Sequence, residues 1–155
     1  MKKILFGSVH TGWTSLLLRL ALGGVMLPHG AQKVLGWYGG YGFTATMNAF
    51  TTSMHIPAPL AFLAIAAESL GALALILGFL TRFAALGLAA NMAVAIATVH
   101  YKNGLFMNWY GQQKGEGFEY HILAGGIALA LVITGAGKLS IDSLLAGGGG
   151  SRSPK

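Results

Sequence analysis

Long apolar stretches alternate with polar connections along this chain, and they are longer than typical strands. Four of them come close to or reach the roughly 20 residues that a helix needs to cross a bilayer. Gly and Ala recur within them, and small residues allow helices to pack closely in lipid. The pattern predicts an all-α membrane protein with a four-transmembrane-helix bundle. The predicted spans run from Trp13 to Leu27, with or without a continuation past Pro28 to Leu35, from Pro59 to Leu80, from Phe83 to His100, and from Tyr120 to Ala136.

The connection between the first two spans has a pattern of its own. Phe43, Met47, Phe50 and Met54 recur at helical spacing with polar residues between them. This spacing predicts a short amphipathic helix in the first outer loop, lying on the membrane surface or capping the bundle. We expect a single transmembrane domain over residues 1–145, followed by a flexible Gly/Ser-rich tail over residues 146–155.

Composition supports a membrane location. The chain is 54% hydrophobic and only 9% charged, whereas soluble domains average about 25% charged. Basic residues gather near span ends, which favours lipid contacts over nucleic acid. With the N-terminus inside, six basic residues lie on the inner side and three on the outer. We therefore expect a multi-pass protein of a bacterial or archaeal inner membrane with both termini cytoplasmic. The inner group is Lys2, Lys3, Arg82, Lys138, Arg152 and Lys155, and the outer group is Lys33, Lys102 and Lys114.

Two charged residues lie inside the apolar stretches. Arg19 belongs to the first predicted span and Glu68 to the second, and such residues normally pair or mark a functional site. Counted inward from Pro28 and Pro59, both lie about 13 Å deep at 1.5 Å per residue. One interpretation is a buried ion pair that fixes the register of the helices. The other is a proton-accepting or ligand-binding pair within an outward-facing cavity.

Polar side chains also gather at the outer ends of the spans. His29, His100 and His121 lie at this level, with Glu119 and Trp109 nearby. Gln32 and Lys33 follow His29 at a spacing that lets one helix face aim them at a common cavity. Imidazoles beside a carboxylate can bind a cofactor or relay protons, although histidines at a wet interface are common. No spacing typical of a metal site occurs, so we predict none. Asn91, in the third span, is expected to donate a hydrogen bond across the bundle.

Three ordered stretches of the sequence act as motifs: LPHGAQKVLGWYGGYGF at 27–43, HIPAPLAFLAIAAESLGALALILGFLTR at 55–82 and GAGKLSIDSLL at 135–145. Together they resemble the DoxX family of small four-span membrane proteins. That family is similar to the DoxD-type subunit of a thiosulfate:quinone oxidoreductase, and other members resemble membrane partners of oxidative-stress enzymes. The resemblance implies importance, without a stated reaction, for Arg19, His29, Gly30, Lys33, Glu68, Arg82 and Asp142.

The hypothesis we favour is an integral membrane subunit of a redox system, quinone-linked and working with a partner protein. Glu68 or His29 would exchange protons, and Arg19 would hold Glu68 ionised or anchor an oxygen. The remaining binding residues would be Lys33, Gln32, His100, His121, Glu119 and Trp109. The cofactor is not identified by the sequence; a quinone fits better than haem or a metal, and the chain contains no cysteine that could exchange disulfides.

The alternative is a non-catalytic membrane anchor or accessory subunit of a larger complex. Both hypotheses include the lipid bilayer and either a protein partner or a homo-oligomer, and neither includes nucleic acid. A transporter is a weaker third interpretation, because no inverted repeat is evident.

Overall fold

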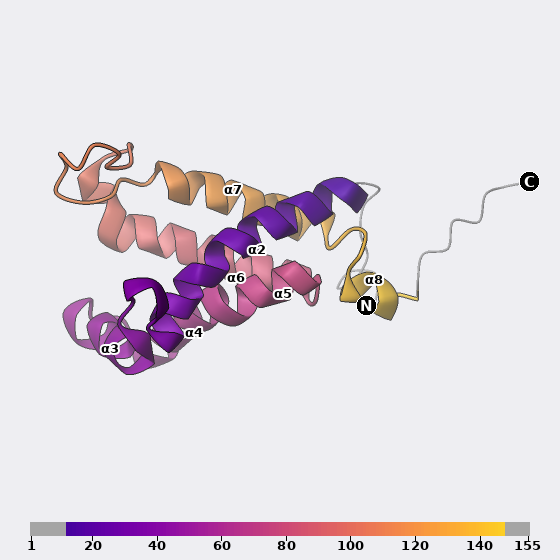
Figure 1. Cartoon of the computed structure of the whole chain (residues 1–155), viewed down its shortest axis with the longest axis horizontal. Helices are drawn as coiled ribbons and strands as arrows, with labels where there is room; N and C mark the ends of the chain where they lie inside the picture. The colour runs from indigo at the N-terminus through magenta and orange to yellow at the C-terminus, as the bar shows by residue number, and fades with distance from the viewer. Residues whose placement is uncertain (1–11, 148–155) are drawn as a thin grey trace, which may run out of the picture.

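All regular secondary structure in the described part of the chain is helical, which confirms the predicted all-α class (Figure 1). The structure is a computed structural model that describes residues 12–147. Lys2, Lys3, Arg152 and Lys155, on which the predicted orientation partly depends, lie outside the described residues, as does most of the Gly/Ser-rich tail.

Helix α2 spans Gly12–Leu35 and continues through Pro28, so the first predicted segment is helical as far as Leu35. Helices α4 (Ala58–Ala66) and α5 (Ala72–Leu77) are joined by a π-helical segment, η3 (Ala67–Gly71). Helix α6 (Thr81–Ala95) continues through the π-helical η4 (Ile96–His100) into the short 3₁₀ segment η5 (Tyr101–Asn103). Helix α7 covers Glu119–Thr134.

Shorter elements lie at the two ends of the molecule. The first long connection contains a 3₁₀ turn η1 (Trp37–Gly39), helix α3 (Gly42–Asn48) and the π-helical η2 (Ala49–Ser53). The predicted helix in this connection therefore exists. The second long connection, residues 104–118, lies at the same end of the molecule, which we call the loop end (Figure 1). Helix α8 (Ile141–Leu145) and the tight turn between α5 and α6 lie at the opposite end, the turn end.

Two of the long helices are long and apolar enough to cross a membrane: Ala58–Leu77, with 20 residues, and Thr81–Asn103, with 23. Helix α7 is apolar but shorter, at 16 residues, and α2 has 24 residues of more mixed character. The expectation of membrane helices is thus confirmed, and that of four spans is supported for two of them.

The outward faces of these helices carry large apolar side chains. Leu63, Leu123 and Ile133 are each at least 60% exposed, while a small core of Leu22, Leu88 and other residues lies between the helices. A soluble monomeric protein rarely exposes so much apolar surface. The arrangement suits a lipid environment, in which every backbone group must be satisfied within a helix.

Close packing of α2 against the α4–η3–α5 helix depends on two glycines. A Cβ atom on Gly23 would lie 2.9 Å from the Ala72 carbonyl oxygen, and one on Gly30 would lie 2.5 Å from Cα of Ser69. Only glycine permits such an approach. These two contacts set the antiparallel register, which places Gly30 level with Glu68 and Ser69.

This register shows that the predicted pairing of Arg19 with Glu68 is wrong. The Arg19 guanidinium lies at the turn end, beside Leu75 and Ile76, about 10 Å along the helix axis from Glu68 at 1.5 Å per residue. The depth estimate failed because it took Pro28 as the outer end of the first span, whereas the helix continues to Leu35.

Arg19 instead joins two segments through backbone carbonyls. Its Nη1 donates to the carbonyl oxygens of Leu75 and Ile76 at 3.0 and 3.2 Å, and its Nη2 to those of Lys138 and Leu139 at 2.8 and 3.1 Å. The side chain is fully buried. It passes so close to Gly78 that a Cβ there would lie 2.3 Å from Nη1, and Gly78 adopts a positive φ of 65°. The Leu75 and Ile76 carbonyls belong to the end of α5, where carbonyls lack a full set of intrahelical partners, and those of Lys138 and Leu139 belong to the connection between α7 and α8.

Asp142 completes the turn end. Its carboxylate accepts hydrogen bonds from the backbone N–H groups of Leu80 and Thr81, at 2.7 and 2.9 Å, where α6 begins. This is how a carboxylate stabilises the start of a helix. Asp142 is therefore held as a structural cap, remote from the loop end.

Candidate functional site

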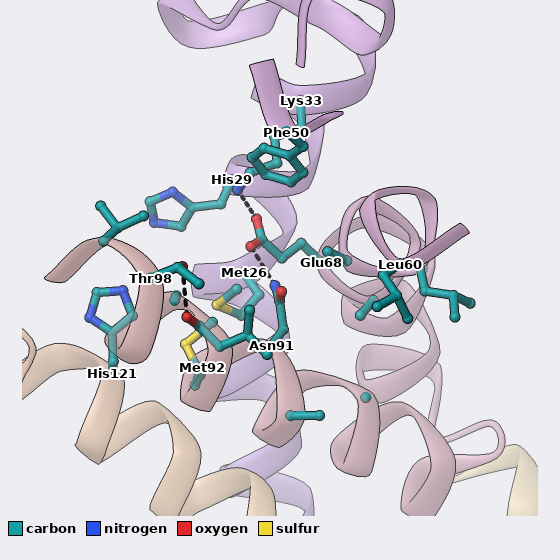
Figure 2. A pocket seen from close by; sticks show the side chains of 18 of the residues that line it. Met26, His29, Lys33, Phe50, Leu60, Glu68, Asn91, Met92, Thr98 and His121 are labelled. Atoms are coloured by element: carbon teal, nitrogen blue, oxygen red, sulfur yellow. Dashed lines mark hydrogen bonds and ion pairs between the residues drawn. The ribbon is translucent and has the colours of Figure 1, made fainter. Parts of the chain in front are cut away.

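The candidate site is built around Glu68, the one acidic residue in the middle of a long apolar helix. Its side chain projects from η3 and the residue is only 7% exposed. One carboxylate oxygen forms an ion pair with Nζ of Lys33, from α2. The other accepts a hydrogen bond from Nδ2 of Asn91, from α6, at 2.7 Å. Figure 2 shows Glu68 between these two partners. The predicted cross-bundle hydrogen bond of Asn91 is therefore confirmed.

Glu68 opens onto a cavity of about 850 Å³. This volume lies within the range of sites that bury most of a small organic ligand. Helices α4 and α6 supply a largely apolar wall, with Asn91 of α6 as an exception, and the other polar lining side chains come mainly from α2, η3, η4 and α7. Phe50 and Met54, from η2 and the residue after it, lie over the loop end of the cavity.

Three histidines and a tyrosine contribute to the polar wall. His29, His100, Tyr120 and His121 all line the cavity. The rings of His100 and His121 lie 4.0 Å apart between centroids, and Nδ1 of His100 lies 2.8 Å from the carbonyl oxygen of Glu116. His121 is 8% exposed, and its Nδ1 has no hydrogen-bond partner. A buried polar atom without a partner needs an explanation, and a bound ligand is one.

The cavity coincides with irregularities in the helices. The described residues contain three π-helical segments, and each contributes to the lining: Phe50 from η2, Ala67 and Glu68 from η3, and Thr98, Val99 and His100 from η4. A π-helical turn costs backbone energy and is found frequently at functional sites. Here the extra residue in η3 reorients the helix locally at Glu68.

The structure brings together five of the nine residues predicted for the site: His29, Lys33, Glu68, His100 and His121. The other four lie elsewhere. Arg19 is at the turn end. Gln32 donates to the carbonyl of Tyr38. Glu119 accepts hydrogen bonds from the backbone of Met107 and from the indole of Trp109, at 2.9 and 3.1 Å, so both belong to the framework of the second long connection.

Sequence reasoning missed several lining residues. Tyr120 lines the cavity, its hydroxyl lies 3.2 Å from Sδ of Met26, and it directly precedes the predicted residue His121. Its position on the same helical turn as His121 was a usable signal. The small lining residues Ala84, Gly87 and Ala90 carried no signal of chemistry, because alanine and glycine are common throughout the spans. In residues 12–147, no group of three or more His, Cys, Asp or Glu residues is arranged to hold a metal ion.

Comparison with known proteins places the chain in a family. It is 29% identical over 147 residues to an uncharacterised protein of Haemophilus influenzae, an alignment that covers 94% of this chain and 91% of the relative. No solved structure matches it. The DoxX family model matches residues 14–101, which include nearly all of α2, the whole first connection, Glu68 and Asn91. This chain therefore belongs to the DoxX family.

Proposed function

We propose that this protein is a four-span inner-membrane subunit of a redox system, that it binds a quinone in the cavity beside Glu68, and that it works with a partner protein. The observation that carries the proposal is the buried Lys33–Glu68–Asn91 cluster in the wall of an otherwise apolar cavity. An ionisable group at such a depth is costly and is retained mainly where it has a task. The family's likeness to a quinone-linked oxidoreductase subunit points the same way.

The polar wall suits a ring that carries two oxygens. The ammonium of Lys33 and the amide of Asn91 are donors at one side, and Nδ1 of His121 is an unpartnered group at the other. A bound quinone accepts two electrons and two protons, and the electrons would come from the partner. Glu68 and the cavity histidines are the groups of this chain placed to exchange the protons. Arg19, once considered for this role, has no part in it, because it lies at the turn end.

The test is the quinone content of the purified protein. Wild-type protein, extracted in mild detergent, should retain a quinone that solvent extraction and chromatography detect. Glu68→Gln should lower that content and any quinone-dependent reduction by roughly tenfold or more, because the variant loses a proton-exchanging group. Glu119→Gln is the matched control: it makes the same carboxylate-to-amide change outside the cavity and should retain the quinone. Wild-type protein with no quinone and no quinone-dependent activity would refute the proposal.

The alternative, a non-catalytic anchor or accessory subunit, is supported by one feature. Both oxygens of Glu68 already have partners within the chain, so the cluster can act as a self-contained structural link between α2, η3 and α6. On this alternative, Glu68→Gln should weaken folding without changing the electron-transfer rate of the assembled complex. A stable partner that copurifies equally with wild type and Glu68→Gln, at unchanged activity, would favour it.

A further inference from the structure

The cavity has an apolar extension that the polar cluster does not use. From Glu68 and Asn91 it continues towards the turn end, where Phe83, Ala84 and Gly87 of α6 line it. Apart from Phe83, the side chains here are small: a Cβ atom on Gly87 would lie 3.6 Å from Cβ of Ala67, in ordinary van der Waals contact. We call this part the tail groove and define it by Ala67, Phe83, Ala84, Gly87 and Ala90.

The polar part of the cavity carries no net formal charge close to Glu68. Lys33 and Glu68 neutralise one another, and Arg19 is engaged at the turn end. The other charged lining residue among those the structure describes is Glu116, an exposed residue of the loop end whose carboxylate accepts from the backbone of Asn108 at 2.8 Å. An anionic head placed beside Glu68 would meet a carboxylate with no surplus cation, which disfavours it.

His121 gives an independent indication that something polar occupies this space. It is more than nine-tenths buried, it lines the cavity, and its Nδ1 has no partner. Figure 2 shows its ring on the cavity side of α7, away from the apolar wall of Leu60. A ligand head that reaches His121 from the Glu68 side, while its remainder lies in the apolar part, accounts for both features.

We propose that the site selects a single-tailed lipid with an uncharged head: the head lies between Glu68 and His121, and the hydrocarbon tail lies in the tail groove, directed towards the turn end. For the quinone proposed above, this assigns a direction to the tail and makes Gly87 and Ala90 residues that determine specificity. Entry is sideways from the bilayer, because the α4 and α6 helices that border the cavity expose their outer faces to lipid. Charged phospholipids and water-soluble donors are excluded from this position.

The experiment compares probes with and without a tail. Binding of a decyl-substituted benzoquinone and of the same ring without its chain is measured by titration calorimetry on protein in neutral-lipid nanodiscs. Gly87→Leu and Ala90→Leu, which fill the tail groove, should weaken the decyl probe by roughly tenfold or more, since overpacking of this size is costly, and should leave the ring alone unaffected. Ala90 is already exposed, so its variant needs little repacking.

Two glycine variants serve as controls. Gly87→Ala adds a methyl group at an ordinary contact distance, and Gly24→Leu adds a large side chain where no neighbour lies within 4 Å of the new Cβ. Both should bind the decyl probe as wild type does. If the leucine variants at 87 and 90 also bind it normally, the tail groove is refuted while the quinone site stands. If wild type binds neither probe, the quinone site itself fails.

The charge of the head is tested with decanoate, which has a comparable tail and an anionic head. Wild type should bind decanoate at least about tenfold more weakly than the decyl-benzoquinone, because the head meets Glu68 without a free cation. Glu68→Gln leaves Lys33 uncompensated and should strengthen decanoate binding. Equal binding of both probes by wild type would overturn the selectivity for an uncharged head.

Discussion

At the scale of single residues, the chain solves the problem of two buried charges in two different ways. The terminal nitrogens of Arg19 donate to four backbone carbonyl oxygens, which cannot change their protonation state. Glu68 is satisfied by two side chains, which can rearrange. The contacts of Arg19 are fixed by the fold, whereas the contacts of Glu68 with Lys33 and Asn91 can be replaced by contacts with a ligand. This difference is why Glu68, and not Arg19, is the group that we assign to the site.

The ion pair makes a direct prediction for stability. Lys33→Met should destabilise the protein by about 1–3 kcal/mol, because it leaves the Glu68 carboxylate buried with Asn91 as its remaining partner. The expected loss is smaller than the roughly 3–5 kcal/mol for breaking a fully buried ion pair, because Lys33 is partly exposed. Adding Glu68→Gln should recover much of the loss. Thermal unfolding in detergent, followed by circular dichroism, measures both.

Arg19 provides the control for this cycle. The effects of Arg19→Met and Glu68→Gln should add to within about 0.5 kcal/mol, because the two residues share no partner. A strong coupling between them, together with a Lys33→Met variant that unfolds at the wild-type temperature, would show that the pairing seen here is wrong.

The sequence identified the costly residues but not their partners. Arg19, Glu68 and Asn91 are each conspicuous in an apolar stretch, whereas the choice of Lys33 over Arg19 as the partner of Glu68 depends on the register between α2 and the next helix. That register is set by contacts at Gly23 and Gly30. Gly30 belongs to one of the DoxX-like motifs, but nothing in the sequence shows which helix it or Gly23 packs against.

At the scale of elements, helix contact through glycine holds Lys33 within reach of Glu68. Gly30 lies one turn before Lys33 on α2, and it packs directly against the backbone of η3 at Glu68 and Ser69. Any side chain at position 30 would separate the two helices at the point where the ion pair forms. The close contact is therefore a condition for the polar cluster.

A pair of alanine substitutions tests this contact. Gly30→Ala should destabilise the protein by about 1–3 kcal/mol, because its Cβ would lie 2.5 Å from Cα of Ser69. Gly24→Ala faces open space and should be neutral or slightly stabilising, since alanine is the better helix former. Comparison of their unfolding temperatures in the same detergent separates packing from helix propensity, and equal values would contradict the packing role of Gly30.

The helices themselves followed from hydrophobic periodicity to within a few residues, because long apolar runs leave the backbone few alternatives in lipid. The sequence left open whether the first helix continues past Pro28, because proline ends many helices but is tolerated in membrane helices where neighbours satisfy the freed carbonyl. The π-helical segments could not be predicted. One extra residue in a turn leaves a long apolar run apolar, so the composition of the run carries no signal for it.

At the scale of the whole molecule, chemistry and stability are separated by position. Both long connections lie at the loop end, opposite α8 and the turn between α5 and α6 (Figure 1). The cavity is lined by residues of both connections, Phe50 and Glu116 among them, whereas Arg19 and Asp142 make their contacts at the turn end. Substitutions at the turn end should therefore change folding more than binding. We propose that the loop end faces outward and the turn end faces the cytoplasm, in line with the basic residues of the sequence.

This orientation can be measured with single cysteines, because the chain has none of its own. Tyr110→Cys lies on the loop end at an 89% exposed position, and Leu144→Cys lies on α8 at a 75% exposed position. In intact cells, a membrane-impermeant maleimide should label the first and should label the second only after permeabilisation. Labelling of both cysteines in intact cells would contradict the proposed orientation.

The Arg19 contacts also have a consequence for biosynthesis. Two of its four acceptors, the carbonyls of Lys138 and Leu139, are made some 119 and 120 residues after Arg19 itself. During synthesis, which proceeds at about 5–20 residues per second, the guanidinium therefore waits several seconds in or near the membrane with half of its final partners. A chain that ends before residue 138 never supplies them. Completion of the bundle is thus coupled to completion of the polypeptide, and a truncated product keeps a guanidinium with only two of its four carbonyl acceptors.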